Sequence, residues 1–260
     1  NISGKGTIFG LRYNQLLRKF GEFYEHKLIY AWDYRAFQNR VVPVGATINF
    51  IPDVTIRPVS LTYFGQWRYP ASEANFYATY VQNIPGGNDG AGSDLQNSRI
   101  DARGAYRILR LGGAYNKVFG NDWITRLAAN AQLSDDALVS GEQFGLGGAE
   151  NIRGFLEREV ANDKGYRGSI EVYTPDLARL AGWDNSRVRV LGFWDFGGVE
   201  RNSVQPGEKP SEFVSGVGFG LRFAWRTDLS LRLDFAEVRN SGGGQGKGDG
   251  RAHFSLSLIF

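Results

Sequence analysis

The sequence predicts an all-β fold, a transmembrane antiparallel β-barrel, and three observations lead to that prediction. Segments in which apolar and polar residues alternate with a period of two recur along the whole chain. Most of these segments reach about ten residues, whereas a typical strand has about five or six. The connections between them alternate between short and long, which is typical of barrels with short periplasmic turns and longer outer loops.

The composition agrees with this class and excludes others. The 260 residues include 35 Gly, 18 Phe, 12 Tyr and 6 Trp, which favours an all-β fold. The 30 Lys and Arg residues are nearly balanced by 27 Asp and Glu residues, and the net charge of +3 is too small to indicate nucleic-acid binding. The absence of Cys excludes thiol catalysis and cysteine-ligated metals. Because the chain has no Met and starts at Asn1, we expect it to be a processed or cut part of a longer protein.

About eleven strands are expected, and each is placed by its own alternating pattern. The last one is the clearest, because its apolar residues share one face and its polar residues share the other. The apolar face of that strand carries Ala252, Phe254, Leu256, Leu258 and Phe260. In chain order the strands are expected near 7–14, 28–35, 57–69, 73–84, 102–118, 122–134, 165–174, 188–196, 217–225, 229–235 and 252–260.

A soluble β-sandwich has the same period, so it is the alternative to be weighed. The strands are too long for it, and their apolar faces carry aromatic residues while the other faces carry Arg, Asp, Glu, Ser and Gly. A closed barrel also leaves no unpaired strand edge in lipid. The long connections, expected outside, are 38–56, 85–99, 135–164, 200–212 and 240–250. The short connections are 15–22, 70–73, 118–121 and 226–228, with a moderate one at 175–186. If the long connections lie outside the cell and the short ones in the periplasm, the last strand ends in the periplasm.

Three small motifs are weak signals for ligands or catalysis. GGNDGAGSD at 86–94 resembles part of a calcium-binding repeat, but it occurs once and such sites need stacked repeats. GGGQGKG at 242–248 lacks the hydroxyl residue and spacing of a phosphate loop. His26 and His253 are the only histidines, and neither has a serine or acid at a catalytic spacing. We therefore expect no enzyme, no metal and no cofactor.

The longest loop carries the informative constellation. It contains QFGLGGAENIRGF at 143–155, where glycines give the backbone freedom at fixed points. Strand parity turns Glu171 and Asp195 towards the lumen, because their neighbours on each strand are apolar and face outward. If the loop folds back into the barrel, Arg153 can meet both carboxylates, since a planar guanidinium accommodates two such partners.

These residues closely resemble the outer-membrane superfamily of polypeptide-transport barrels with periplasmic POTRA domains. The loop motif is matched by Ile152, Arg153, Gly154 and Phe155, preceded by Gly147 and Gly148; the strand motif F-x-D-x-G is matched by Phe193, Asp195 and Gly197. Within the superfamily, LGGAENIRGF and the DKG element at 163–165 look more like a two-partner-secretion transporter of the haemolysin-activator and filamentous-haemagglutinin type.

The resemblance implies roles for these residues. Arg153 would lock the loop to Asp195, with Glu171 as a second acidic partner. The C-terminal targeting signal would be Phe254, Leu256, Leu258 and Phe260. The chain would lie in the outer membrane of a Gram-negative bacterium and secrete a partner polypeptide without ATP. Its other partners would be outer-membrane lipid and, during biogenesis, the barrel-assembly machinery.

The resemblance also bears on domain organisation and leaves alternatives. Family barrels have sixteen strands, so residues 1–260 would be one barrel domain, with five upstream strands and the POTRA domains outside this chain. A strand at 42–50 would instead make twelve and permit a small closed barrel. The alternative functions are a barrel-assembly insertase of the same superfamily, a passive pore, and a barrel that anchors an upstream passenger domain.

Overall fold

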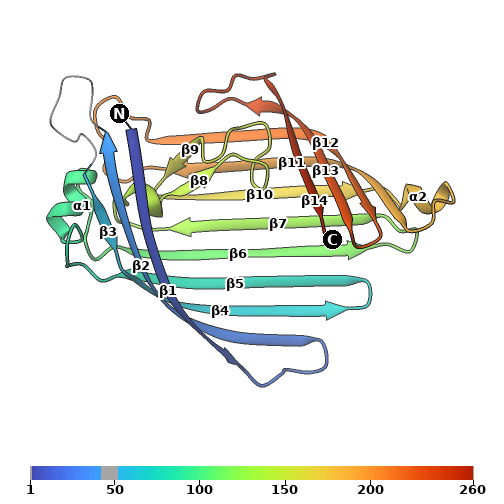
Figure 1. Cartoon of the computed structure of the whole chain (residues 1–260), viewed down its shortest axis with the longest axis horizontal. Coiled ribbons are helices and arrows are strands. Elements are labelled where there is room, and N and C mark those ends of the chain that lie inside the picture. The colour runs from blue at the N-terminus through green and yellow to red at the C-terminus, as the bar shows by residue number, and fades with distance from the viewer. Residues whose placement is uncertain (1, 42–51, 260) are drawn as a thin grey trace.

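The computed structural model describes residues 2–41 and 52–259, and its main element is one long antiparallel sheet. The sheet has 12 strands in the order β1-β2-β4-β5-β6-β7-β10-β11-β12-β13-β14, with the short β3 paired to β2 (Figure 1). Its strands are β1 (Ile2–Leu16), β2 (Tyr24–Val41), β3 (Val54–Ile56), β4 (Pro58–Tyr69), β5 (Ser72–Asn83), β6 (Arg107–Val118), β7 (Ile124–Leu133), β10 (Lys164–Tyr173), β11 (Ser186–Glu200), β12 (Ser211–Trp225), β13 (Leu229–Asn240) and β14 (Gly250–Leu258).

The remaining elements lie in the connections. They are α1 (Gly92–Ser98), the 3-10 turn η1 (Ser140–Glu142), the hairpin strands β8 (Phe144–Leu146) and β9 (Val160–Asn162), and α2 (Leu177–Leu180). No helix in the part of the chain that the structure describes is long and apolar enough to cross a membrane.

Each expected strand corresponds to one long strand of the sheet. The boundaries differ in two ways. The strand expected at 102–118 begins only at Arg107, because residues 92–98 form α1 and the chain then turns back towards the sheet. Other strands run further than expected towards the long-loop end: β2 reaches Val41, β12 begins at Ser211 and β13 reaches Asn240, and the short β3 lies within the loop expected at 38–56. The alternative strand at 42–50 and the terminal Phe260 lie outside the described residues.

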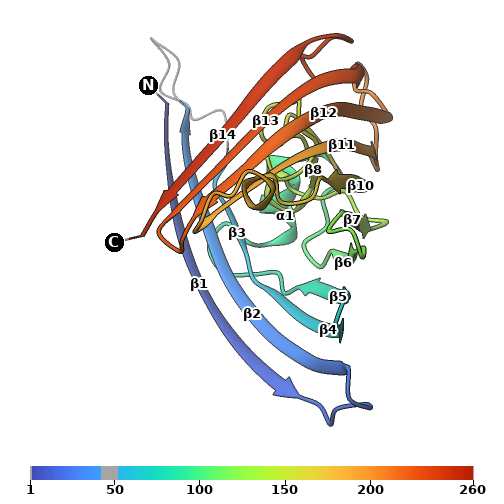
Figure 2. The same cartoon turned by 90° about the vertical axis from the view of Figure 1, so that its right-hand side faces the viewer.

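The sheet curves into an open trough (Figure 2). Within residues 2–41 and 52–259, β1 pairs only with β2 and β14 pairs only with β13, so these two strands form the edges. The small closed barrel is therefore not the arrangement of the described residues. The short connections meet at one end of the strands, the short-turn end; the long ones meet at the other, the long-loop end, as the sequence predicted.

The two faces of the sheet have the predicted chemistry. The convex face exposes large apolar side chains, including Phe219, Phe235, Phe254, Leu256 and Leu258. The concave face buries Asp195 on β11 and Asp234 on β13, next to the exposed Trp194 and Phe235 on the same strands. Because side chains in a strand point alternately to the two faces, the alternating sequence directly produces an apolar outside and a polar inside.

Candidate functional site

The connection between β7 and β10, residues 134–163, folds back into the trough rather than projecting from it. Figure 2 shows β8 and α1 lying inside the curve of the sheet. We call residues 134–163 the inner loop. Its hairpin strands β8 and β9 form a separate two-stranded sheet that contacts β10 and β11.

Apolar packing fixes the tip of the inner loop on the concave face. Ile152 and Phe155 are almost completely buried in a cluster to which the inner loop and three neighbouring strands contribute. The other members are Leu146, Val160, Val199, Val214 and Val238, with Phe144 against them. Burial of two large side chains on β11, β12 and β13 brings the intervening Arg153 against the same strands.

Glycines permit the close approach of the loop to the sheet. Gly147, Gly148 and Gly154 have φ of +103°, +115° and +103°, a region that side-chain-bearing residues rarely adopt. On β11, a Cβ at Gly197 would lie 2.9 Å from the Cδ1 atom of Ile152. A larger residue at 197 would therefore push the loop tip off the strand.

Arg153 makes a bidentate contact with Asp195. Its Nε lies 2.7 Å from Asp195 Oδ2, and its Nη2 lies 2.8 Å from Asp195 Oδ1. The backbone N–H of Arg153 donates to the same Oδ2 at 3.1 Å. Only 3% of Arg153 is exposed, so this charge is held almost completely out of water. Such an arginine requires partners, because an unpaired buried charge is costly.

Two further groups lie against the guanidinium. Glu171 on β10 lies 2.8 Å from Arg153 Nη2. The ring of Phe193 on β11 lies beneath the guanidinium carbon, with 3.4 Å from that carbon to the ring centroid. The structure thus brings together Arg153, Asp195, Glu171 and Phe193, all four of which the sequence selected.

The carboxylates are themselves held by neighbouring side chains. Ser169 donates to Asp195 Oδ1 at 2.6 Å, and Tyr173 donates to Glu171 Oε2 at 2.5 Å. These bonds fix the carboxylate rotamers, so the acidic pocket is preorganised for one guanidinium.

A third carboxylate, Asp234 on β13, lies beside Arg153 and was not predicted from the sequence. Its Oδ1 lies 3.6 Å from Arg153 Nη1, and it also pairs with Arg222 at 2.8 Å and Arg232 at 3.2 Å. A signal was available, because Asp234 stands on the polar side of its strand, the side that faces the trough.

The start of the inner loop has a separate ionic anchor, also missed. The buried Glu142 accepts from Arg35 of β2 and Arg110 of β6, each at 2.7 Å. The loop is therefore held on one wall of the trough through Glu142 and on the other through Arg153.

Among residues 2–41 and 52–259, no group of three or more His, Asp or Glu side chains is placed to hold a metal ion. The lumen-facing His253 lies near the loop tip, with its Nε2 3.4 Å from the backbone nitrogen of Gly154.

The targeting-signal residues Phe254, Leu256 and Leu258 are exposed on the convex face of β14, and Phe260 lies outside the described residues.

Comparisons with known proteins agree with this geometry. The family model of haemolysin secretion/activation proteins ShlB/FhaC/HecB matches residues 59–223, which is more than half of the chain. A search of curated protein sequences gives no match.

Solved structures of low sequence identity share the fold of this chain. CdiB from Escherichia coli superposes with a TM-score of 0.81 at 18% identity, covering 99% of this chain and 46% of that one. CdiB from Acinetobacter baumannii gives 0.74 at 16% identity, covering 98% and 42%. BamA from Haemophilus ducreyi lacking POTRA domains 1–3 gives 0.57 at 14% identity, covering 99% and 59%. The chain thus spans less than half the length of the two CdiB structures.

Proposed function

The chain belongs to the haemolysin secretion/activation family ShlB/FhaC/HecB, and from this premise we propose that it forms part of a protein-export channel. It is an outer-membrane β-barrel segment of a Gram-negative bacterium. The complete protein would move a partner polypeptide, bearing a secretion signal, through the lumen to the cell surface. Without ATP in the outer membrane, folding of the exported chain outside the cell would supply the direction.

The observation that carries the proposal is the inner loop fixed across the concave face. Arg153 contacts Asp195, Glu171 and Phe193 with almost no exposure to solvent. A loop in this place occupies space that an exported polypeptide needs. We infer that the Arg153–Asp195 pair holds the loop in its resting position and that the loop shifts during export.

The open trough supports a second part of the proposal, on domain organisation. The edge strands β1 and β14 carry unpaired backbone groups, which lipid does not tolerate. We propose that five further strands close the barrel between β1 and β14, and that periplasmic POTRA domains precede them and capture the partner polypeptide.

An export assay with the full-length protein tests this function. Cells that carry the full-length transporter and its partner polypeptide should release the partner into the medium. Cells without the transporter should retain the partner in the periplasm. An insertase would give a different result: its loss would lower the amounts of many outer-membrane proteins and leave export of one partner no more affected than the rest.

A further inference from the structure

One buried carboxylate at the long-loop end joins three loops. The side chain of Asp163 has no exposed surface and accepts from Arg99 Nη1 and Nη2 at 2.6 and 2.7 Å. It also accepts from the backbone N–H groups of Leu138 at 2.8 Å and Asn202 at 2.7 Å. Arg99 belongs to loop 84–106, Leu138 and Asp163 to the inner loop, and Asn202 to loop 201–210.

Arg99 reinforces the same junction from its own side. Its Nη1 donates to the carbonyl oxygen of Leu138 and its Nη2 to that of Asn202, both at 2.9 Å. The Asp163 carboxylate therefore has its full set of four donors only while all three loops stay together. Movement of loop 84–106 would remove both guanidinium donors, and movement of loop 201–210 would remove the Asn202 N–H, so either movement leaves a buried carboxylate with fewer partners, a costly state.

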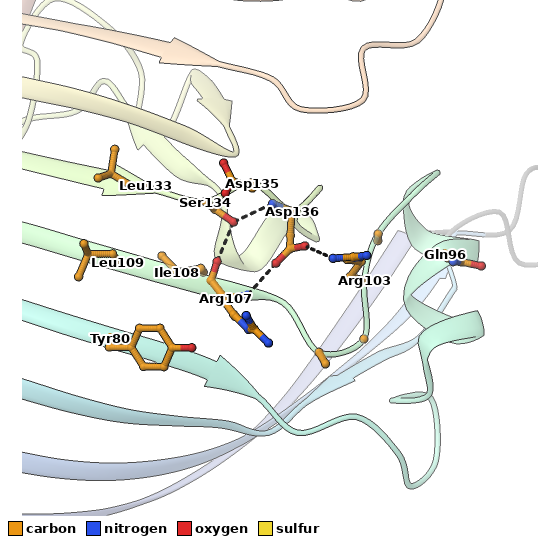
Figure 3. A pocket seen from close by; sticks show the side chains of 13 residues that line it. Tyr80, Gln96, Arg103, Arg107, Ile108, Leu109, Leu133, Ser134, Asp135 and Asp136 are labelled. Atoms are coloured by element: carbon orange, nitrogen blue, oxygen red, sulfur yellow. Dashed lines mark hydrogen bonds and ion pairs between the residues drawn. The ribbon is translucent and has the colours of Figure 1, made fainter.

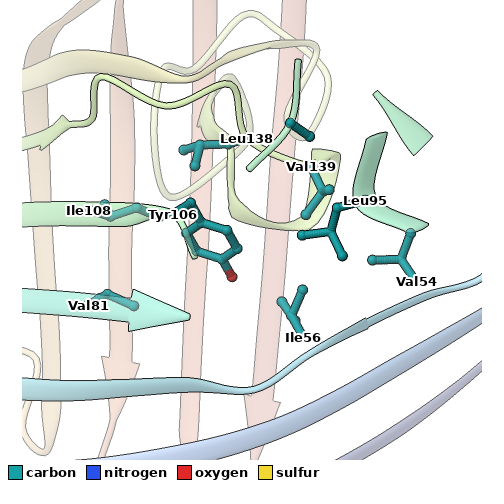
Figure 4. Close-up of a cluster of buried hydrophobic side chains, with 9 residues drawn as sticks. Val54, Ile56, Val81, Leu95, Tyr106, Ile108, Leu138 and Val139 are labelled. Carbon is teal, nitrogen blue, oxygen red and sulfur yellow. The ribbon is translucent and has the colours of Figure 1, made fainter. Parts of the chain in front are cut away.

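An apolar cluster beneath this junction fills the same end of the trough (Figure 4). Leu95 from α1 and Leu138 and Val139 from the inner loop meet side chains from β3, β5 and β6. The remaining members are Val54, Ile56, Val81, Ala102, Tyr106 and Ile108. The loops thus pack across the concave space rather than extending away from it, and the junction at Asp163 secures them there.

We propose that Arg99 and Asp163 are positioning residues that hold the outer mouth of the channel closed and must separate when an exported polypeptide leaves. This proposal rests on the export function above. It adds a second closure, because the junction shares no residue with the contact of Arg153 and Asp195. Opening would expose the Asp163 carboxylate and the Arg99 guanidinium to water. Water solvates each charge and weakens the attraction between them, so the pair separates more easily once water has entered the junction.

A neighbouring ion pair provides a matched control. Arg103 and Asp136 connect the same two loops, 84–106 and the inner loop, at 3.4 Å (Figure 3). The side chain of Arg103 is 77% exposed, and exposed pairs contribute little. Loss of Arg103 should therefore leave the closure intact, although it removes an arginine from the same loop.

Channel recordings from the full-length protein in planar bilayers test the closure directly. Arg99→Gln and Asp163→Asn should each increase the fraction of time spent open at least tenfold over the unmodified protein, whereas Arg103→Gln should not. Equal open fractions for Arg99→Gln and the unmodified protein would overturn the proposal, as would an equal effect of Arg103→Gln.

A reversible cross-link gives a second test, in which a covalent linker takes the place of the Arg99 contacts. The chain has no cysteine, so Arg99→Cys with Asn202→Cys provides the only thiols in this region. A bis-methanethiosulfonate linker about as long as an arginine side chain should join loops 84–106 and 201–210, stop export, and release it when reductant is added. The control pair, Arg201→Cys with Glu208→Cys, replaces an ion pair of 2.8 Å within one loop and should not affect export.

The outcomes separate the two proposals. Undiminished export through the cross-linked channel would overturn the role of Arg99 and Asp163. If even the unmodified transporter exports nothing, the export function fails, and bilayer recordings of the cross-linked channel still decide the closure. A cross-linked channel that stays shut until reductant is added supports it, and one that opens as freely as the unlinked channel refutes it.

Discussion

Removing the side chain of Arg153 should release the tip of the inner loop and lower export of the partner polypeptide. The guanidinium contacts three carboxylates and one aromatic ring, whereas the Asp195 side chain bonds only Arg153 and Ser169 among the described contacts. Arg153→Ala should therefore be more damaging than Asp195→Ala. The barrel itself should still insert, because the affected contacts join the loop to the sheet and are not those that pair the strands.

The structure allows the magnitudes to be ranked. Removing one partner of a buried ion pair costs about 3–5 kcal/mol. Asp195→Ala leaves Arg153 paired with Glu171 at 2.8 Å and stacked on Phe193, so its cost should lie near the lower limit. Arg153→Ala removes the close cation from both Asp195 and Glu171, whereas Asp234 keeps Arg222 and Arg232, so its cost should lie near the upper limit. Even about 3 kcal/mol changes the ratio of docked to released loop by about 100-fold.

Two assays on the full-length transporter measure this effect. Export of the partner should fall in both variants, and the inner loop should become sensitive to protease in the inserted protein. The double variant should be little worse than Arg153→Ala, because both changes break one contact. Arg226→Ala, in the turn between β12 and β13, is the matched control. Export and protease resistance at the unmodified level in Arg153→Ala would refute the reasoning.

Three further predictions concern the lipid face, the loop backbone and acid. Leu231→Arg places a charge on the convex face and should destabilise the barrel by about 2–4 kcal/mol if that site is near the membrane midplane, measured by urea unfolding in lipid. Gly154 has φ +103°, so Gly154→Ala should cost about 1–3 kcal/mol and lower export without lowering the amount of inserted protein. Burial raises the pKa of Glu159, but hydrogen bonds from the backbone N–H groups of Leu156 and Gly244 outweigh it and hold that pKa below 4.5. Because the pKa of Glu159 is lower in the folded protein than in the unfolded chain, ionised Glu159 stabilises the docked inner loop above its ordinary pKa. This contribution is lost as the pH falls through the lowered pKa, so protease sensitivity of the inner loop should rise on acidification, and Glu159→Gln should remove that dependence.

The strands were predictable because their signal is local. Successive side chains of a strand point to opposite faces of the sheet. Because one face of this sheet is apolar and the other polar, every strand shows the same alternation in its sequence. The same parity placed Glu171 and Asp195 on the concave face. The contact of these carboxylates with Arg153 could not be predicted from the alternation, because the alternation does not show that a loop turns inward. That prediction came from the resemblance to the family motif.

The parts that escaped prediction depend on contacts between distant segments. Glu142 stands in a loop with no periodicity, and its partners Arg35 and Arg110 are far away in sequence. The junction of Arg99 and Asp163 likewise joins loops whose meeting is set by the tertiary fold. Such pairs have no spacing rule, because the chain between them can have any length.

Site-specific photo-cross-linking to a stalled partner tests the central claim most directly. A photoreactive residue at Ser230, on the concave face, is compared with one at Leu231, on the convex face, in the full-length transporter. The partner polypeptide is fused to a rapidly folding domain so that it stops during passage. We predict cross-links to the partner from Ser230 and none from Leu231. Equal cross-linking from both positions, or release of the unfused partner with no cross-link from Ser230, would contradict passage through the lumen.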